Sequence, residues 1–265
     1  MRQVNQRKCK APQNNLTLLP AYSKISAIRK SHQRSAALIM MGQVRAPKLL
    51  RKPFRVYKRE QARISRHTLY PVTAIYTLYS VTMLVVGFRS GRPLAAFAFY
   101  LAGIPVWTLF EYLSHRYVLH GRFKRSQHSY KVYKTLANKY LDPLHWEHHE
   151  RPFDGKHING EWKDLLPVFG ISILLSFLFP AYSAPMLMAG VVQCYVLEEW
   201  VHHSVHFYNF RNPYFRYIRK HHIYHHTSSG MERGFGFTSG IWDVVFKTRF
   251  PEHVRQRLYG RENTR

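Results

Sequence analysis

Cysteines, acidic residues and nucleotide-binding motifs are scarce or missing in this sequence. Of 265 residues only 2 are cysteines, and 14 are acidic against 40 Lys and Arg. Cys9 lies in a basic segment and Cys194 in an apolar run, so the sequence predicts neither a disulfide nor a cysteine metal site and fits a reducing compartment. It has no glycine-rich nucleotide loop and no internal repeat beyond the histidine spacings described below.

Long apolar runs are present although the mean hydropathy of the chain, -0.33, is negative. Runs without a formal charge cover residues 69–88, 93–110 and 165–197, which are 20, 18 and 33 residues long. About 20 residues cross the hydrocarbon core as a helix. Three such runs in one chain therefore indicate a multi-pass membrane protein rather than a soluble protein with one buried helix.

The third run is longer than one span, and Pro180 and Pro185 interrupt it. Because proline breaks a helix interior, we expect two helices here, at about 162–179 and 185–201. The fold class is then all-α and integral to the membrane, with four transmembrane helices in two hairpins. The segment 115–160 and everything after residue 201 fall on one side of the membrane, which the sparsely charged opposite loops identify as the cytoplasmic side.

Basic residues dominate the first 66 positions, where 17 Lys and Arg accompany a single acid, Glu60. We expect residues 1–66 to form a poorly ordered basic arm and residues 67–265 to form the membrane-embedded domain. A cytoplasmic flank that touches acidic headgroups, an organelle transit peptide and an extension upstream of a start at Met40 or Met41 all remain open. Only this arm points to nucleic acid, so we expect no nucleic-acid partner.

Histidines recur in four motifs with the spacings H-x4-H, H-x2-H-H, H-x3-H and again H-x2-H-H. In the four-span topology all of them lie in a cytoplasmic helical cap just beyond the bilayer. The candidate metal ligands are His115, His120, His145, His148, His149, His202, His206, His222, His225 and His226.

The spacing brings most of these imidazoles together, because residues three and four apart share a helix face. His115 and His120 are five apart, so we expect them to diverge and to bind from a helix end. One metal ion takes four to six ligands, so ten imidazoles predict two ions. Neutral imidazole suits zinc, iron or copper, whereas magnesium and calcium prefer oxygen.

The other histidines are expected to be polar side chains at the membrane interface or in solvent: His32, His67, His128, His157 and His253. His203 and His221 stand beside candidate ligands, and we expect them to support a ligand or to be solvated.

Four phrases resemble the fatty acid hydroxylase and sterol desaturase superfamily: "HRYVLH", "HWEHHERPFDG", "EEWVHHSVH" and "RKHHIYHHTSSGMERGFGFTSGIWDVVFKT". The resemblance covers about residues 110–250 and is strongest to fatty acid 2-hydroxylases. Two positions depart from the family pattern, with Glu199 where the family usually has Asp and Phe207 where a histidine often follows His206.

This resemblance implies a hydroxylase domain at 67–265 in which the ten histidines hold two iron ions, or zinc in isolated protein. The centre activates O2, removes a hydrogen atom from an unactivated C–H bond and returns a hydroxyl group. The expected substrate is the acyl chain of a lipid in the bilayer, a fatty acid or sphingolipid, hydroxylated near C2. The b-type cytochrome domain fused to some members is not in the sequence, so we expect a separate electron donor, a b-type cytochrome or a ferredoxin with its reductase.

Candidates for orienting imidazole N–H groups are Glu199, Glu198 and Asp154, although Asp154 also suits a plain turn. We expect the phrase "GFGFTSGIWDVVF" to fold back over the cap, with Phe235 and Trp242 as core or substrate-wall residues. The expected location is the endoplasmic reticulum in a eukaryote or the inner membrane in a bacterium.

Other functions stay open. Sterol oxidation or desaturation and carotenoid ring hydroxylation belong to the same superfamily. A membrane zinc hydrolase needs a general-base carboxylate as in H-E-x-x-H, which is absent. A metal transporter places ligands within the spans, whereas the acids of the apolar runs stand at their cytoplasmic ends: Glu111, Glu198 and Glu199.

Overall fold

The computed structural model describes residues 48–120 and 142–260, and these residues contain helices and loops without a strand. The predictions for residues 1–47 and for His128 lie outside the described residues. The main helices are α2 (Lys48–Arg89), α3 (Pro93–Leu113), α5 (Asp142–Glu150), α6 (Leu166–Leu178), α7 (Ala184–Phe207), α8 (Pro213–His225), α9 (Ile241–Val245) and α10 (Glu252–Tyr259). Two short elements are η1 (Ser114–Leu119), a π-helix, and η2 (Trp162–Leu165), a 3-10 helix.

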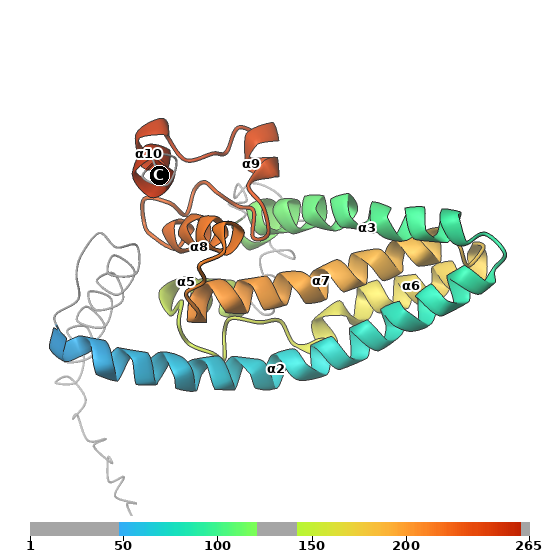
Figure 1. Cartoon of the computed structure of the whole chain (residues 1–265), viewed down its shortest axis with the longest axis horizontal. Helices are drawn as coiled ribbons and strands as arrows, with labels where there is room; N and C mark the ends of the chain where they lie inside the picture. Colours follow the sequence, from blue (N-terminus) through green and yellow to red (C-terminus); the bar gives the residue numbers. More distant parts are fainter. Residues whose placement is uncertain (1–47, 121–141, 261–265) are drawn as a thin grey trace, which may run out of the picture.

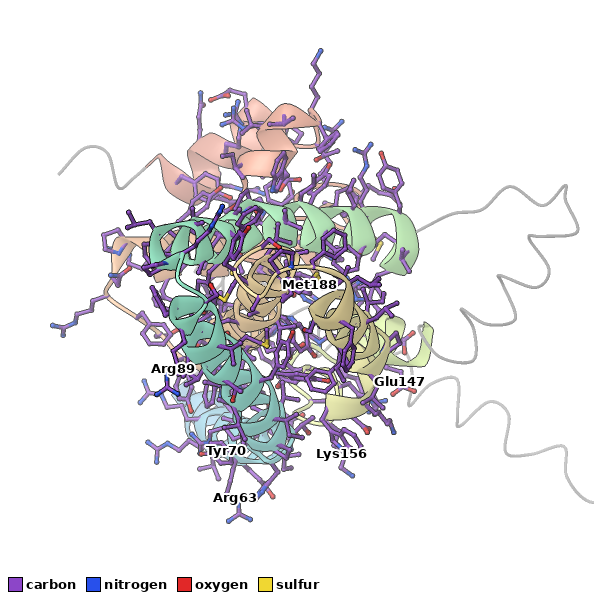
Figure 2. All side chains as sticks on the ribbon, turned by 90° about the vertical axis from the view of Figure 1, so that its right-hand side faces the viewer. Arg63, Tyr70, Arg89, Glu147, Lys156 and Met188 are labelled. Atoms are coloured by element: carbon purple, nitrogen blue, oxygen red, sulfur yellow. The ribbon has the colours of Figure 1, made fainter. Side chains whose placement is uncertain are left out.

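Helix α7 lies at the centre of a bundle with α2, α3 and α6, as Figure 1 shows. Its core contains Tyr76, Trp107, Val192 and Tyr195, which are buried. In the end-on view of Figure 2, Met188 of α7 lies near the middle, while the charged side chains of Arg63 and Lys156 lie at the periphery. The bundle thus buries one apolar seam and leaves much apolar surface facing outward.

Two glycines allow α3 and α7 to approach closely. A Cβ atom on Gly103 would come within 2.6 Å of the backbone nitrogen of Val191, and one on Gly190 would collide with the carbonyl oxygen of Tyr100. Glycine therefore sets the spacing of the two helices whose ends carry histidines.

The chain turns back between α2 and α3, and it also turns at the break predicted from Pro180 and Pro185. Gly91, with φ of 79°, turns the chain between α2 and α3, and residues 179–183 separate α6 from α7. By length and composition, two helices of the described residues could cross a membrane, Phe54–Arg89 and Pro93–Leu119. Helix α6 is apolar but has only 13 residues. The four-span topology and the cytoplasmic orientation stay predictions.

Helix α2 begins about twenty residues earlier than the first apolar run, so the expectation that residues 48–66 belong to a poorly ordered arm is wrong. The reason is packing against the cap. Ala62 forms a buried cluster with Ile158 and Phe207, and the side chain of Gln61 accepts the N–H of Gly155 at 2.9 Å. These contacts place the first half of α2 beneath the loop that follows α5.

The cap gathers at the end of the bundle where α3 and α7 end. Helices α5 and α8 stand against that end, and α9 and α10 lie beyond α8 (Figure 1). The chain of α3 continues into η1, where the N–H of His120 bonds to the carbonyl of His115 at 3.0 Å. This i→i+5 bond is characteristic of a π-helix. It stacks residues five apart, so His115 and His120 converge instead of diverging as expected.

Candidate metal centre

The predicted ligands gather in two clusters of imidazoles at the junction of the bundle and the cap. The first cluster consists of His148, His202, His206, His222 and His226. The second cluster consists of His115, His120, His145, His149 and His225. The structure brings these side chains together. That they bind metal stays a prediction.

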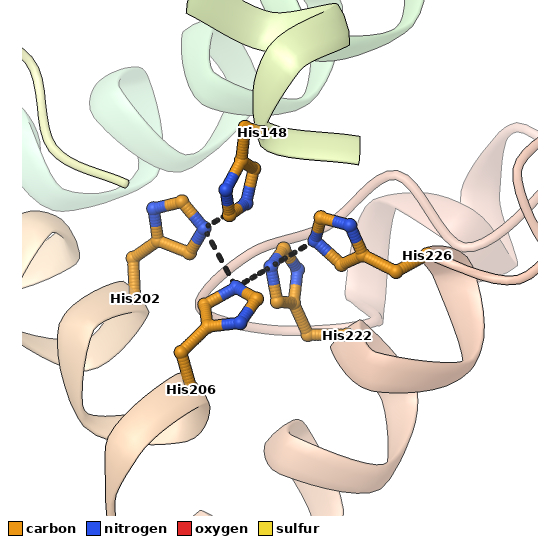
Figure 3. A group of neighbouring side chains, drawn as sticks. All are labelled: His148, His202, His206, His222 and His226. Atoms are coloured by element: carbon orange, nitrogen blue, oxygen red, sulfur yellow. Dashed lines mark hydrogen bonds between the residues drawn. The ribbon is translucent and has the colours of Figure 1, made fainter. Parts of the chain in front are cut away.

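The first cluster is assembled by α5, α7 and α8 (Figure 3). Its ligand atoms all lie within 4.8 Å of one another, and all five residues are buried. Successive Nε2 atoms are 3.0, 3.2, 2.9 and 3.0 Å apart in the order His148, His202, His206, His222, His226.

Protons alone do not satisfy this chain of nitrogens. The five Nε2 atoms make four successive contacts. If donors and acceptors alternate along the chain, two or three of the Nε2 atoms are donors. Each donor carries a single proton on Nε2, so these protons cannot supply four hydrogen bonds. A cation accepts every lone pair at once. Nitrogens bound at right angles about 2.1 Å from one metal ion lie roughly 3.0 Å apart. The cluster therefore fits a metal ion with several imidazole ligands.

The second cluster combines η1, α5 and α8. The ligand atoms of His115, His120, His149 and His225 lie within 4.8 Å of one another. The Nε2 atom of His120 is 2.8 Å from that of His145 and 3.1 Å from that of His225. His115 is buried, and its Nε2 atom has no hydrogen-bond partner among the described residues. A buried orphan nitrogen aimed at other imidazoles also fits a metal ion.

Backbone carbonyls orient two imidazoles of the second cluster. Nδ1 of His225 donates to the carbonyl of Arg233 at 2.8 Å, and Nδ1 of His115 donates to the carbonyl of Phe235. A proton held on Nδ1 leaves the lone pair on Nε2, which is the arrangement of metal-bound histidines.

Burial keeps these imidazoles neutral. It lowers the pKa of His148 and His222 well below the ordinary 6.5, and neighbouring imidazoles lower it further. The pKa of His225 falls to about 3 for the same reasons, burial first and then His120. At neutral pH the cap therefore offers uncharged nitrogen ligands.

A cavity of about 300 Å³ borders both clusters. The clustered histidines on its wall are His115, His145, His148 and His202, and His157, which belongs to neither cluster, also lines it. Aromatic residues of α3 and α7 line its other side, among them Trp107, Phe110 and Tyr195. An apolar chain lying in this cavity would reach both clusters.

Comparison with known proteins identifies the family of this chain. A model of the fatty acid hydroxylase family matches residues 100–248, more than half of the chain. The chain belongs to the fatty acid hydroxylase family. All ten clustered histidines lie within the matched residues.

Among curated relatives, rat fatty acid 2-hydroxylase is 29% identical over 60% of this chain and 41% of its own length. The dihydroceramide fatty acyl 2-hydroxylase FAH2 of Arabidopsis thaliana is 32% identical over 55% of this chain and 58% of its own. A solved structure of full-length scs7p, in which only the hydroxylase domain is visible, has a TM-score of 0.59 and 26% identity, and the match covers 69% of this chain and 67% of that one. The chain thus spans about two fifths to three fifths of these curated relatives.

In this family member the segment 233–248 folds over the second cluster. The ring of Phe235 lies 5.7 Å from those of His115 and His225, and Phe237 stacks on His115 at 4.1 Å. Trp242 is half-buried and donates to Thr108 at 3.1 Å. The expectation that this phrase folds back over the cap is confirmed, and Phe235 packs against the histidines.

The motif glycines make this fold possible. Gly234 has a φ of 68°, which L side chains rarely adopt, and a Cβ there would strike the ring of Phe250. A Cβ on Gly236 would collide with the carbonyl of Ser239. The loop is therefore too tight for other residues at these two positions.

The acidic candidates for orienting imidazoles have other partners as well. Glu198 accepts Nε1–H of Trp107 at 3.0 Å, and Glu199 accepts Nδ2–H of Asn159 at 2.7 Å. Asp154 pairs with Arg151 at 3.3 Å and accepts the N–H of Lys156, as a turn residue does. The orienting role of Glu198 and Glu199 stays a prediction.

His203 and His221, which each stand beside a candidate ligand in the sequence, connect elements of the cap and the bundle. Nδ1 of His203 lies 2.8 Å from the hydroxyl of Ser65 on α2, so His203 ties α7 to α2. Nε2 of His221 lies 3.4 Å from a carboxylate oxygen of Asp243, and its Nδ1 lies 3.2 Å from the hydroxyl of Tyr259. Both are buried, so the solvated alternative is excluded.

Two buried acids, Glu111 and Asp243, hold the loop that covers the second cluster. They were not assigned this role from the sequence. Glu111 accepts the N–H groups of Phe237 and Thr238, at 2.6 and 3.0 Å, and Asp243 accepts those of Phe235 and Gly236. The only signal for them was an acid inside an otherwise apolar phrase. Their partners are backbone groups, which a sequence does not display.

Proposed function

We propose that this chain is an O2-dependent di-iron hydroxylase that acts on the acyl chain of a membrane lipid near C2. The observation that supports it most is a cavity, partly lined by aromatic residues, that both imidazole clusters border. Two iron ions held by the first and second clusters would supply the redox chemistry that O2 activation and C–H cleavage require.

The protein contributes position, neutrality and dryness. Buried neutral imidazoles present lone pairs into the clusters, and the carbonyls of Arg233 and Phe235 hold two of them in the required tautomer. Aromatic residues of the cavity wall, among them Trp107 and Tyr195, exclude water and hold the acyl chain of the lipid beside the clusters. The acyl carbon that lies nearest the histidines is then the carbon that reacts.

The bundle is proposed to lie in the membrane with the cap on the cytoplasmic side. The two long apolar helices and the α6–α7 hairpin together make four crossings, and basic residues crowd the side where the cap stands. A lipid would reach the cavity from the bilayer without leaving the hydrocarbon entirely.

The charge of the cavity wall bears on the substrate. Glu111, Glu198 and Glu199 line it, and no Lys or Arg does so among the described residues. The part of the wall that the structure describes thus offers no cation that would pair with a carboxylate headgroup, while its acidic side chains can accept hydrogen bonds from N–H and O–H groups. We therefore propose an acyl chain in amide linkage, as in a sphingolipid, rather than a free fatty acid. The dihydroceramide named for the Arabidopsis relative has such a linkage.

The hydroxylation needs two electrons to reduce the second oxygen atom to water, and side chains do not supply them. We propose a separate electron donor, a b-type cytochrome or a ferredoxin with its reductase, and no nucleic-acid partner.

Metal analysis and isotope labelling test the proposal together. Protein purified in detergent should contain about two iron ions per chain, or zinc if misloaded. Incubation with an N-acyl sphingoid lipid, an electron donor and labelled O2 should give a 2-hydroxyacyl product that carries the label. The free fatty acid is the matched comparison and should react more slowly.

The possible failures differ in meaning. Folded protein without metal would contradict the di-metal centre. A hydroxyl oxygen without the label would contradict O2 as its source, and release of the free fatty acid and the sphingoid base would indicate a zinc hydrolase, because water then adds across the amide bond. A double bond, a sterol product or a hydroxylated carotenoid ring would keep the family and overturn the proposed substrate.

A further inference from the structure

Asp243 lies in the first turn of α9, outside the two histidine clusters, and is fully buried. Its carboxylate accepts the N–H of Phe235 at 2.9 Å, the N–H of Gly236 at 3.1 Å and the hydroxyl of Thr248 at 2.7 Å. His221 approaches it at 3.4 Å. A buried carboxylate with this many donors is a fixed anchor, because each lost bond would leave a desolvated polar group.

The anchored loop is the one that orients the second cluster. The residue whose N–H is held, Phe235, uses its carbonyl to accept Nδ1–H of His115. Two residues earlier, the carbonyl of Arg233 accepts Nδ1–H of His225 at 2.8 Å. Both carbonyls belong to one tight turn, in which Gly236 has no room for a side chain. Displacing the turn would move both carbonyls together.

The first cluster touches the same loop in a different way. The ring of Phe237 lies 5.0 Å from that of His202 and 5.2 Å from that of His222, which are apolar contacts without a direction-setting hydrogen bond. The helices α7 and α8 instead fix the pairs His202–His206 and His222–His226, whose members are one helical turn apart. The loop is therefore coupled to the two clusters unequally.

We propose that Asp243 is a positioning residue for the second metal site alone, acting through the carbonyls of Phe235 and Arg233 on His115 and His225. The inference rests on the metal binding proposed above. Replacing Asp243 should weaken the metal at the second cluster and leave the metal at the first cluster in place.

Graded chelation of iron-loaded protein in detergent tests this. Wild type should release its iron in steps from two sites, and His225→Ala and His206→Ala should each retain the site of the other cluster and so identify the steps. Asp243→Asn keeps the size of the side chain but loses acceptor capacity. It should weaken only the second-cluster step, by about 10- to 100-fold, as loss of an orienting partner does.

Glu252→Gln is the control. Glu252 is an exposed acid at the start of α10 that forms its ion pair with Arg255, so both release steps should stay as in wild type. The absorption spectrum of the iron that remains in Asp243→Asn should match that of His225→Ala and not that of His206→Ala. A merely structural role would not produce this site-specific match.

Unchanged release from Asp243→Asn, or equal weakening of both steps, would overturn the inference. If Asp243→Asn does not fold, Thr248→Val removes one donor to the carboxylate and should weaken the second-cluster step to a smaller degree; equal or absent weakening there also overturns it. Wild type without iron would instead contradict the proposed function, so the two failures are distinguishable.

Discussion

The two histidine clusters have the same chemistry but are built by different means. The first is made from residues of ordinary α-helices and from His226, the C-cap of α8, and its pairs on α7 and at the end of α8 are each four residues apart. The second depends on the π-helix η1 and on carbonyls of a loop more than a hundred residues away in sequence. A cluster built on helix periodicity is robust, whereas one built on an irregular turn and a distant loop can be lost separately.

Removal of one ligand from each cluster should have the largest effect. His206→Ala and His225→Ala should each lower hydroxylation by at least about 100-fold, beyond the effect of outer partners, because the reaction is proposed to need both sites. Product analysis by mass spectrometry measures this. Full activity of either variant would show that one cluster suffices.

The π-helix offers a way to break the second cluster without touching a ligand. Deleting Val118 converts H-x4-H into H-x3-H and removes the extra residue of the turn. Iron should fall toward one ion per chain and activity should drop by about 100-fold. Val118→Ala, which keeps the spacing, should retain both ions. Two ions in the deletion variant would contradict the role assigned to η1.

Acid should affect both clusters in the same direction. The pKa values of His148, His222 and His225 are lowered in the folded protein, so the unfolded chain binds more protons than the folded one below about pH 6.5. The contribution of these histidines to the free energy of unfolding is fully present above about pH 6.5. It decreases as the pH falls, by up to about 1.4 kcal/mol per pH unit for each histidine. Melting temperatures of metal-free protein between about pH 7 and pH 4 measure the loss. A constant melting temperature would show that the imidazoles are already solvated.

The distance between the two clusters should depend on how closely α3 and α7 approach each other at Gly190. Gly190→Ala would push α3, which leads to His115, away from α7, which carries His202. We expect a loss of about 1–3 kcal/mol in stability, retained iron and reduced activity. Gly170→Ala, at a helix position with open space around it, is the control and should be neutral or stabilising. Unaltered stability in Gly190→Ala would show that the crossing is adaptable.

The same difference explains how much was predictable from the sequence. The helix breaks near Pro180 and Pro185 and the grouping of His202 with His206 follow from local rules, and the structure agrees with both. The convergence of His115 with His120 was not predictable, because a π-turn depends on tertiary contacts. The extension of α2 to Lys48 was missed for a similar reason, since its support comes from Ile158 and Phe207.

The roles of Glu111 and Asp243 were also out of reach. Their partners are the backbone N–H groups of a loop whose path depends on Gly234 and Gly236. A sequence shows the acid and the glycines but not which amide faces which carboxylate. Contacts of this kind join residues 111 and 237, which no local pattern connects.

The order of synthesis gives the distant loop another consequence. The first cluster lacks a member until His226 has been made, and the second lacks its orienting carbonyls until Arg233 and Phe235 have followed. At about 5–20 residues per second, the ribosome completes α7, the last helix of the bundle, seconds before either cluster is whole. The proposed metal ions would therefore be acquired only after every helix of the bundle has been made.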